Sequence, residues 1–136
     1  EVELKDVIGR CAENHEGRFR ASGPSVMLPP EAALALYMCL HELTTNSLKY
    51  GALVSETGSI EVAWSRQEER DILLVWREEG GPVVSAPTRQ GFGTKLVDRL
   101  ARHELNGRLE RDYRPSGLVV RGSFRLSPKS RFRSDM

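Results

Sequence analysis

The sequence has few of the features that mark specialised classes of protein. Its 136 residues include only two cysteines, Cys11 and Cys39, which are too few for a disulfide scaffold or a cysteine-rich metal site. Its 20 Lys and Arg residues almost balance its 19 Asp and Glu residues, so no strong basic field favours nucleic acid or an anionic membrane. No apolar run approaches the roughly 20 residues that a membrane-spanning helix needs. The acidic, amphipathic N-terminal segment also differs from a signal peptide.

The overall composition is that of an ordinary soluble domain. Hydrophobic residues make up 39% and charged residues 29% of the chain, which is long enough for one domain with its own core. Both cysteines lie in apolar helical patterns, so we expect buried, reduced thiols and a cytoplasmic location. The polar, basic residues 128–136 are expected to form a disordered tail after a single domain of residues 1–127.

Apolar residues recur at helical spacing in three segments, and they alternate at strand spacing over residues 59–65 and 71–78. The prolines at positions 29 and 30 indicate the start of the second helix, and Gly51 indicates its end. A stretch rich in Gly, Pro and Ser over residues 80–93 predicts a loop. We expect helices over about 2–12, 32–50 and 94–105, and strands over about 18–22, 59–65, 71–78, 108–113 and 118–126.

The segment "HELTTNSLKYG" over residues 41–51 begins like a zinc-protease helix, but Thr45 occupies the position of the second histidine. At 100° per residue, Glu42, Asn46 and Lys49 share one face of the helix and Tyr50 lies at its edge. The other sides carry apolar residues that we expect to be buried, namely Leu36, Met38, Leu40, Leu43 and Leu48.

The simpler interpretation of a polar stripe is an ordinary solvated helix face. The residue types in this stripe fit that interpretation poorly. Thr44, Thr45, Asn46 and Ser47 are weak helix formers clustered in the middle of the helix, which indicates that their side chains serve a purpose. An amide oxygen beside a carboxylate suits a hard cation such as Mg²⁺. A lysine one turn further along suits phosphate.

Two other segments contain glycines next to polar groups. In "GFGTKL", Gly91 and Gly93 precede the helix expected at Thr94, which suits either an anion at the helix start or a plain helix cap. In "WREEGGP", Glu78 falls on the core-facing side of its strand, where a carboxylate needs a hydrogen-bond donor. The donor could be the amine of a purine, with Gly80 and Gly81 leaving room for the base. Alternatively, Glu78 lies past the strand end and caps a turn.

Taken in this order, the three segments resemble the ATP-binding catalytic domain of the HWE family of bacterial sensor histidine kinases. That family is named for a histidine and a Trp-x-Glu pair, which His41, Trp76 and Glu78 match. The resemblance covers residues 18–126 and implies the Bergerat fold shared with gyrase, Hsp90 and MutL. This fold is an α/β (α+β) two-layer sandwich of a mixed sheet with helices on one face. The resemblance also implies Mg²⁺ and ATP as cofactors.

The resemblance implies a role for each matching residue. Asn46 would coordinate Mg²⁺ on the phosphates, and Glu42 would occupy the adjoining metal-and-water position, where related ATPases keep a general base. Lys49 would reach the phosphates, Tyr50 would pack near the adenine, and Glu78 would accept from the adenine amine and so favour ATP over GTP. The other implied nucleotide contacts are His41, Trp76, the first glycine box (Gly80 and Gly81), Arg89 in a lid, and the second glycine box (Gly91, Phe92, Gly93 and Thr94).

The implied activity is transfer of the γ-phosphate to a histidine in a separate dimerisation domain, with a response regulator as an indirect partner. His15, His41 and His103 all lack the surrounding sequence of that acceptor, so the chain resembles a catalytic domain without its phosphoacceptor. A serine kinase of the anti-sigma type and a nucleotide-sensing module without transferase activity remain as alternatives.

Overall fold

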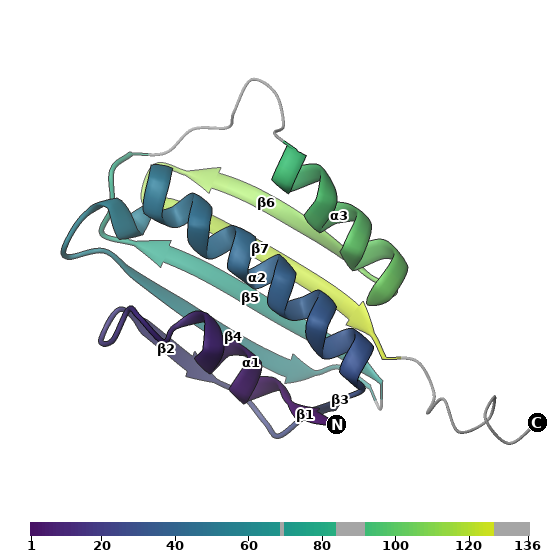
Figure 1. The fold of residues 1–136 in the computed structure, drawn as a ribbon. Helices are drawn as coiled ribbons and strands as arrows, with labels where there is room; N and C mark the ends of the chain where they lie inside the picture. Colours follow the sequence, from purple (N-terminus) through teal and green to yellow (C-terminus); the bar gives the residue numbers. More distant parts are fainter. Residues whose placement is uncertain (69, 84–91, 127–136) are drawn as a thin grey trace, which may run out of the picture.

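The computed structural model describes residues 1–68, 70–83 and 92–126 (Figure 1). In chain order its elements are β1 (Val2–Glu3), α1 (Leu4–Cys11), β2 (Phe19–Ser22), β3 (Met27–Leu28), α2 (Pro30–Tyr50), the short 3₁₀ helix η1 (Ala52–Val54), β4 (Ser59–Arg66), β5 (Asp71–Glu79), α3 (Phe92–Glu104), β6 (Arg108–Arg114) and β7 (Gly117–Arg125).

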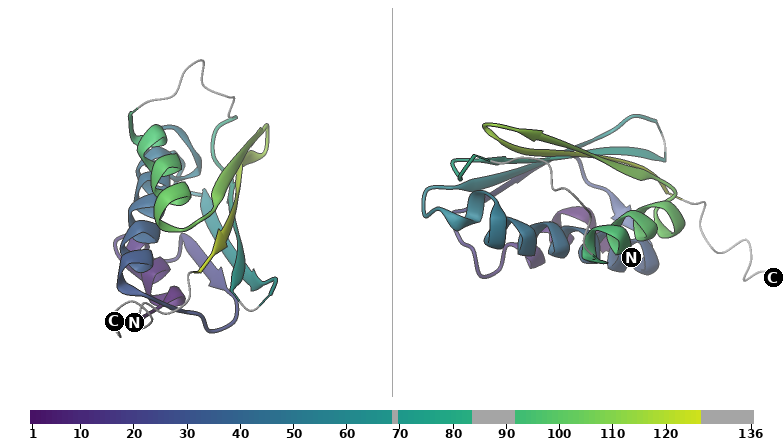
Figure 2. Two further views of the ribbon diagram at one scale, coloured as in Figure 1. Left: turned by 90° about the vertical axis from the view of Figure 1, so that its right-hand side faces the viewer. Right: turned by 90° about the horizontal axis from the view of Figure 1, so that it is seen from above.

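Five strands form one mixed sheet in the order β2-β4-β5-β7-β6. Strand β2 pairs with β4 in parallel, whereas the other neighbours in the sheet are antiparallel. In both views of Figure 2 the helices α1, α2 and α3 lie on one side of this sheet. The predicted α/β two-layer sandwich, with a mixed sheet and helices on one face, is therefore confirmed.

The hydrophobic core lies between the sheet and the helices. On β4 and β5 every second side chain faces the helices and is buried, including Trp64 and Trp76, as the strict alternation in the sequence predicts. Helix α2 crosses the middle of the sheet and fills this layer with small and branched apolar side chains. The ends of α2 and β5 are therefore held at fixed places by apolar packing.

The predicted helices are present, with three differences in detail. Met38 and Leu48 were expected to be buried but are 39% and 44% exposed, because the side of α2 away from the sheet is not covered by any described element. Val2 belongs to β1 rather than to the first helix. Helix α3 begins at Phe92, two residues before the expected Thr94, so that Gly93 lies within its first turn.

Some expectations concern segments outside the described residues. These are the disordered tail over 128–136 and two members of the expected nucleotide contacts, Arg89 and Gly91. None of the helices that the structure does describe is both long enough and apolar enough to cross a membrane.

Both cysteines are buried free thiols, as predicted. The Cys39 thiol donates to the carbonyl oxygen of Val97 on α3, with 3.7 Å between the atoms. Burial raises the pKa of the Cys11 thiol from 9.0 to about 12. Burial is also the main cause that raises the pKa of the Cys39 thiol to about 12. The nearby charge of Arg111 lowers this pKa by less, and the charge of Asp98 raises it by less. Both thiols therefore stay protonated at neutral pH.

The raised thiol pKa values predict slow alkylation of the folded protein. At pH 8, Cys11 and Cys39 should react with iodoacetamide two to three orders of magnitude more slowly than in guanidinium chloride, since the thiolate is the nucleophile. Because folding favours the protonated thiol, its contribution to stability is intact below pH 9 and declines as the pH rises from there towards 12. Mass spectrometry of timed samples gives both rates. Equal rates in the folded and unfolded chains would contradict the burial of these thiols.

Candidate functional site

The carboxylate of Glu78 is the most tightly held polar group between the sheet and α2. Glu78 lies within β5 and is only 3% exposed. Its Oε1 accepts hydrogen bonds from the Ser47 hydroxyl at 3.0 Å and from the Ala52 backbone N–H at 2.9 Å. Its Oε2 accepts one from the Trp76 indole N–H at 2.9 Å. Glu78 therefore does not lie past the strand end, so that part of the alternative is wrong. Its carboxylate does accept a backbone N–H of the turn after α2, as the turn-capping part of the alternative predicts, and the protein itself supplies donors to it.

Ser47 connects this carboxylate to the end of α2. The side chain is 1% exposed, and its oxygen accepts from the Leu53 N–H of η1 at 3.1 Å while its hydroxyl donates to Glu78. Thr44, which is also buried, donates to the carbonyl oxygen of Leu40 in its own helix at 2.8 Å. Two of the four weak helix formers in α2 therefore serve the fold, and the half-buried Thr45 and Asn46 remain beside solvent.

Glu42 and Asn46 lie one turn apart on α2, and both are half-buried. The first turn of α3 approaches this pair closely: a Cβ atom at Gly93 would lie 2.1 Å from Oε2 of Glu42. Within the part of the chain that the structure describes, the Asn46 amide has no recorded hydrogen-bond partner. The segment "HELTTN" and Gly93, which are about 50 residues apart in the sequence, therefore meet at the Glu42 carboxylate.

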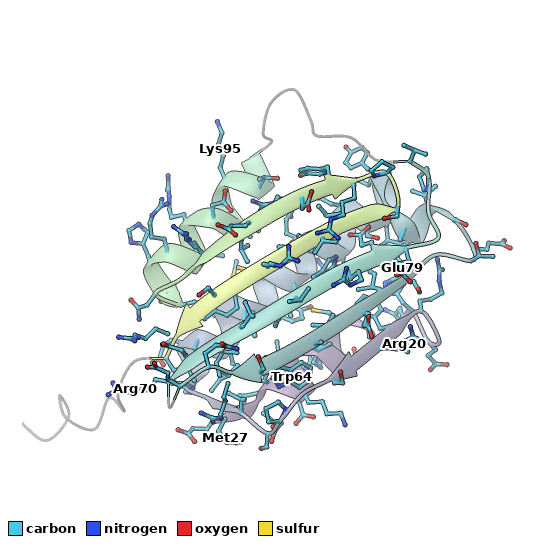
Figure 3. All side chains as sticks on the ribbon, turned by 180° about the vertical axis from the view of Figure 1, so that it is seen from behind. Arg20, Met27, Trp64, Arg70, Glu79 and Lys95 are labelled. Carbon is cyan, nitrogen blue, oxygen red and sulfur yellow. The ribbon has the colours of Figure 1, made fainter. Side chains whose placement is uncertain are left out.

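The end of the stripe is open to solvent. Lys49 is exposed and Tyr50 is 71% exposed. Lys95 projects outward from the first turn of α3 (Figure 3). Lys49 therefore places a positive charge one turn after Asn46 on the stripe, and the first turn of α3, where helices have backbone N–H groups without intrahelical partners, lies against Glu42. The arrangement suits a polyanion that carries its own cation.

His41 does not face the other expected nucleotide contacts, and Trp76 reaches them only through Glu78, to which its indole N–H donates. The exposed His41 ring stacks on Tyr37 with centroids 5.7 Å apart, and it lies about 140° around α2 from Asn46. The Trp76 side chain is 0% exposed and packs edge-on against Phe19 with centroids 5.8 Å apart. Any effect of Trp76 on a ligand must therefore pass through Glu78.

The first glycine box packs against the protein's own backbone. Gly80 has φ +82°, in the left-handed region that side chains disfavour. A Cβ atom at Gly81 would lie 2.4 Å from Cα of Ala52. The structure thus supplies a reason for both glycines that involves no ligand. Of the second box, Phe92 begins α3, while Gly93 and Thr94 lie in its first turn and are half-buried.

The donor set fits Mg²⁺ better than a metal held entirely by the protein. No group of three or more His, Cys, Asp or Glu side chains that could hold a metal occurs in the described ranges. Glu42 and Asn46 offer a carboxylate and an amide oxygen, so phosphate oxygens and water would have to complete the shell. Mg²⁺ usually binds in this way, through one or two protein ligands together with substrate phosphates.

Sequence reasoning missed Ser47 as a member of the site. A signal for it was present, because at 100° per residue Ser47 falls on the same face of α2 as the buried Leu36, Leu40 and Leu43. A hydroxyl on a core face needs a hydrogen-bond partner. The partner could not be named from the sequence, since Glu78 lies 31 residues away on another element.

Comparison with known proteins gives two kinds of finding, although no model of a protein family matches the chain. The chain is 40% identical over 127 residues to the blue-light-activated histidine kinase 1 of Erythrobacter litoralis (strain HTCC2594). The match covers 88% of this chain but only 35% of that protein, so the chain spans about a third of its length.

Solved structures show the same fold. The histidine kinase domain of the Erythrobacter litoralis EL346 blue-light-activated histidine kinase superposes with a TM-score of 0.74 at 17% identity, covering 97% of this chain and 63% of that one. The catalytic domain of the histidine kinase ThkA superposes with a TM-score of 0.69 at 15% identity, covering 94% of this chain and 97% of that one. The described chain therefore corresponds in fold to nearly the whole of the ThkA catalytic domain.

The close approach of Gly81 to Ala52 predicts a loss of stability that is independent of any nucleotide. Gly81→Ala should lower the free energy of unfolding by about 1–3 kcal/mol, because the added Cβ meets backbone atoms that cannot turn aside. Urea denaturation of the nucleotide-free protein measures this change.

Gly9→Ala is the matched control, since a Cβ at that position in α1 meets nothing within 4 Å. This control should stabilise the protein slightly, by about 0.5–1 kcal/mol, because alanine is the better helix former. If Gly81→Ala were as stable as the wild type but bound nucleotide weakly, the glycine would serve the ligand rather than the fold.

Proposed function

This chain belongs to the histidine kinases, as its 40% identity to one of them over 88% of its length shows, and from that premise we propose that it binds Mg-ATP and donates the γ-phosphate to a histidine in another domain. The match to a Trp-x-Glu pair and to His41 supports placement in the HWE family. The match covers only about a third of the relative, which supports a longer parent protein that supplies the acceptor histidine.

The observation that carries this proposal is the convergence of the three motif segments on the second half of α2. Gly93 at the start of α3 lies against the Glu42 carboxylate. On the other side, Ser47, the neighbour of Asn46, donates to the buried Glu78 on β5. Helix α2 therefore carries Glu42 and Asn46, whose oxygens suit Mg²⁺, and it lies between the first turn of α3 and the Glu78 carboxylate, which could bind the base. A solvated helix face would not need either contact.

In this proposal each residue holds one part of the nucleotide. The Asn46 amide oxygen and the Glu42 carboxylate would hold Mg²⁺, and this ion would neutralise charge on the phosphates. Lys49 is exposed on the same stripe and would contact phosphate oxygens, while the exposed Tyr50 ring would pack near the base. Glu78 would accept from the adenine amine. The chemistry required of the protein is then chiefly positioning and charge neutralisation, as is usual in phosphoryl transfer.

The proposed partners are the proteins or domains that would accept the phosphate, because none of the three histidines of this chain has the surrounding sequence of the acceptor. We propose the dimerisation domain of a parent kinase as the immediate phosphate acceptor and a response regulator as the next. His41, although exposed, stacks on Tyr37 and lies on α2 itself, so we do not assign it as an acceptor. The cytoplasmic location expected from composition stays a prediction.

Replacement of Asn46 should remove most of the magnesium dependence of ATP binding. Asn46→Ala deletes the half-buried amide that has no recorded partner in the described part of the chain, so the fold should be little affected. We expect Mg-ATP affinity to fall by at least about tenfold, the loss seen even for residues that only support metal ligands. Calorimetric titration with and without Mg²⁺ measures both quantities.

Asn14→Ala is the control, because Asn14 is an exposed residue in the turn after α1. This variant should bind Mg-ATP as the wild type does. Unchanged affinity and unchanged metal dependence in Asn46→Ala would remove Asn46 from the site.

The chain should bind ATP without labelling itself and should label a dimerisation domain supplied separately. Radiolabelled ATP is incubated with the chain, with the dimerisation domain of its parent kinase, and with both. Label should appear on the dimerisation domain only in the mixture and should be lost in acid, as phosphohistidine is. Transfer should be slow, because the untethered partner loses an effective concentration of millimolar order.

Two outcomes would contradict the assignment. Acid-stable label on the isolated chain would indicate a serine kinase. Intact ATP binding with no label under any pairing would indicate a nucleotide-sensing module.

A further inference from the structure

The hydrogen bonds of Glu78 leave room for one more donor. A carboxylate offers about four acceptor positions, two on each oxygen. Ser47 and Ala52 occupy both positions on Oε1, and Trp76 occupies one position on Oε2. Among the described residues, one position on Oε2 therefore remains. All three partners are donors, so Glu78 presents an acceptor, and only an acceptor, at that last position.

The three donors also fix where the remaining position points. A glutamate side chain has several rotatable bonds, and a single hydrogen bond would leave the carboxylate able to turn. Here Oε1 is held from α2 and η1, while Oε2 is held from β5, so the plane of the carboxylate is fixed at both ends. The indole that holds Oε2 is itself immobile, because it is 0% exposed and packs against Phe19.

We propose that Trp76 and Ser47 are positioning residues for base recognition, holding the Glu78 carboxylate so that its one unused acceptor position meets the N–H of a nucleobase amine. This inference rests on the proposed nucleotide binding and goes beyond it, because both residues would act through Glu78 and not by touching the ligand, in contrast to the direct contact that the resemblance implies for Trp76. Trp76 has no exposed surface and Ser47 has 1%. Both act by deciding where Oε2 points and how many donors it can still accept.

Loss of the indole N–H should then weaken selectivity rather than binding in general. Without it, Oε2 has two open positions and the carboxylate can turn about its remaining bonds to Ser47 and Ala52. The amine of the base would meet a less well-placed acceptor. A ligand that lacks the amine makes no use of this position, so its affinity should barely change.

The test compares ATP with purine riboside triphosphate, in which a hydrogen replaces the exocyclic amine. Dissociation constants of both ligands with Mg²⁺ are measured by calorimetry for the full chain and its variants. The wild type should prefer ATP by at least about tenfold, since the analogue leaves a buried acceptor unpaired. Trp76→Phe keeps an aromatic ring and removes the N–H, and it should reduce this preference by at least about fivefold through weaker ATP binding.

Trp64→Phe is the matched control. The Trp64 indole N–H donates to the carbonyl oxygen of Pro24 at 2.7 Å and is equally part of the core. Ile60 on β4 is the cross-strand partner of Glu78. Trp64 lies four residues further along β4, which is about 13 Å from Ile60 at the usual rise per residue. Figure 3 shows Trp64 and Glu79, the neighbour of Glu78, towards different ends of the sheet. Trp64→Phe should leave the ratio of the two affinities unchanged.

Ser47→Ala provides a second variant that acts on the other oxygen. It removes the hydroxyl that donates to Oε1 and should also lower the preference for ATP over the analogue. A merely structural role of either residue would instead weaken both ligands by the same factor and leave their ratio at the wild-type value. Thermal unfolding of each variant shows that the measured protein is folded.

The outcomes separate this inference from the proposed function. A wild-type chain that binds neither ligand would overturn the proposed function itself. A wild-type chain that binds both equally would retain nucleotide binding but remove Glu78 as the reader of the amine, and this inference with it. A wild-type preference that survives in Trp76→Phe and in Ser47→Ala would overturn the positioning role alone.

Discussion

The burial of one carboxylate constrains the whole end of the molecule at which the candidate site lies. A carboxylate that is 3% exposed must receive hydrogen bonds, because an unpaired buried charge is strongly destabilising. Glu78 receives them from α2, η1 and its own strand. The end of α2 and the turn after it must therefore keep a fixed position relative to β5. The same contacts place Asn46, the neighbour of Ser47, at the border of the core.

This constraint connects stability with the proposed chemistry. Phosphoryl transfer depends mainly on positioned groups that neutralise charge. Helix α2 supplies such groups on one side and core contacts on the other, so the apolar packing that holds the helix also holds Glu42 and Asn46. The glycine at position 93 lets α3 begin directly against Glu42, since even a methyl group there would displace the carboxylate. Fold and site thus share the same close contacts.

Most of the fold could be predicted from periodicity, because each helix and strand buries one face. The alternation in β4 and β5 predicted two strands with one buried face each, and Pro30 and Gly51 bounded α2 correctly. The wrong predictions of burial concern side chains whose exposure depends on which other elements pack against their helix. Met38 and Leu48 have the residue type of a core position, but exposure depends on neighbouring elements that local pattern does not specify. The start of α3 was likewise misplaced, since glycine usually ends a helical pattern rather than joining its first turn.

The sequence alone determined which chemical groups are present, which faces of the elements are apolar and in which order the motif segments occur. These are local properties, set by residue type and by the 3.6- and 2-residue periods of helix and strand. Only the tertiary structure decided that Gly93 meets Glu42, that His41 lies apart from Asn46, and that Trp76 and Ser47 both donate to Glu78. Contacts such as Ser47 with Glu78 join residues distant in the chain, and they depend on how helices and sheet pack, which no single segment specifies.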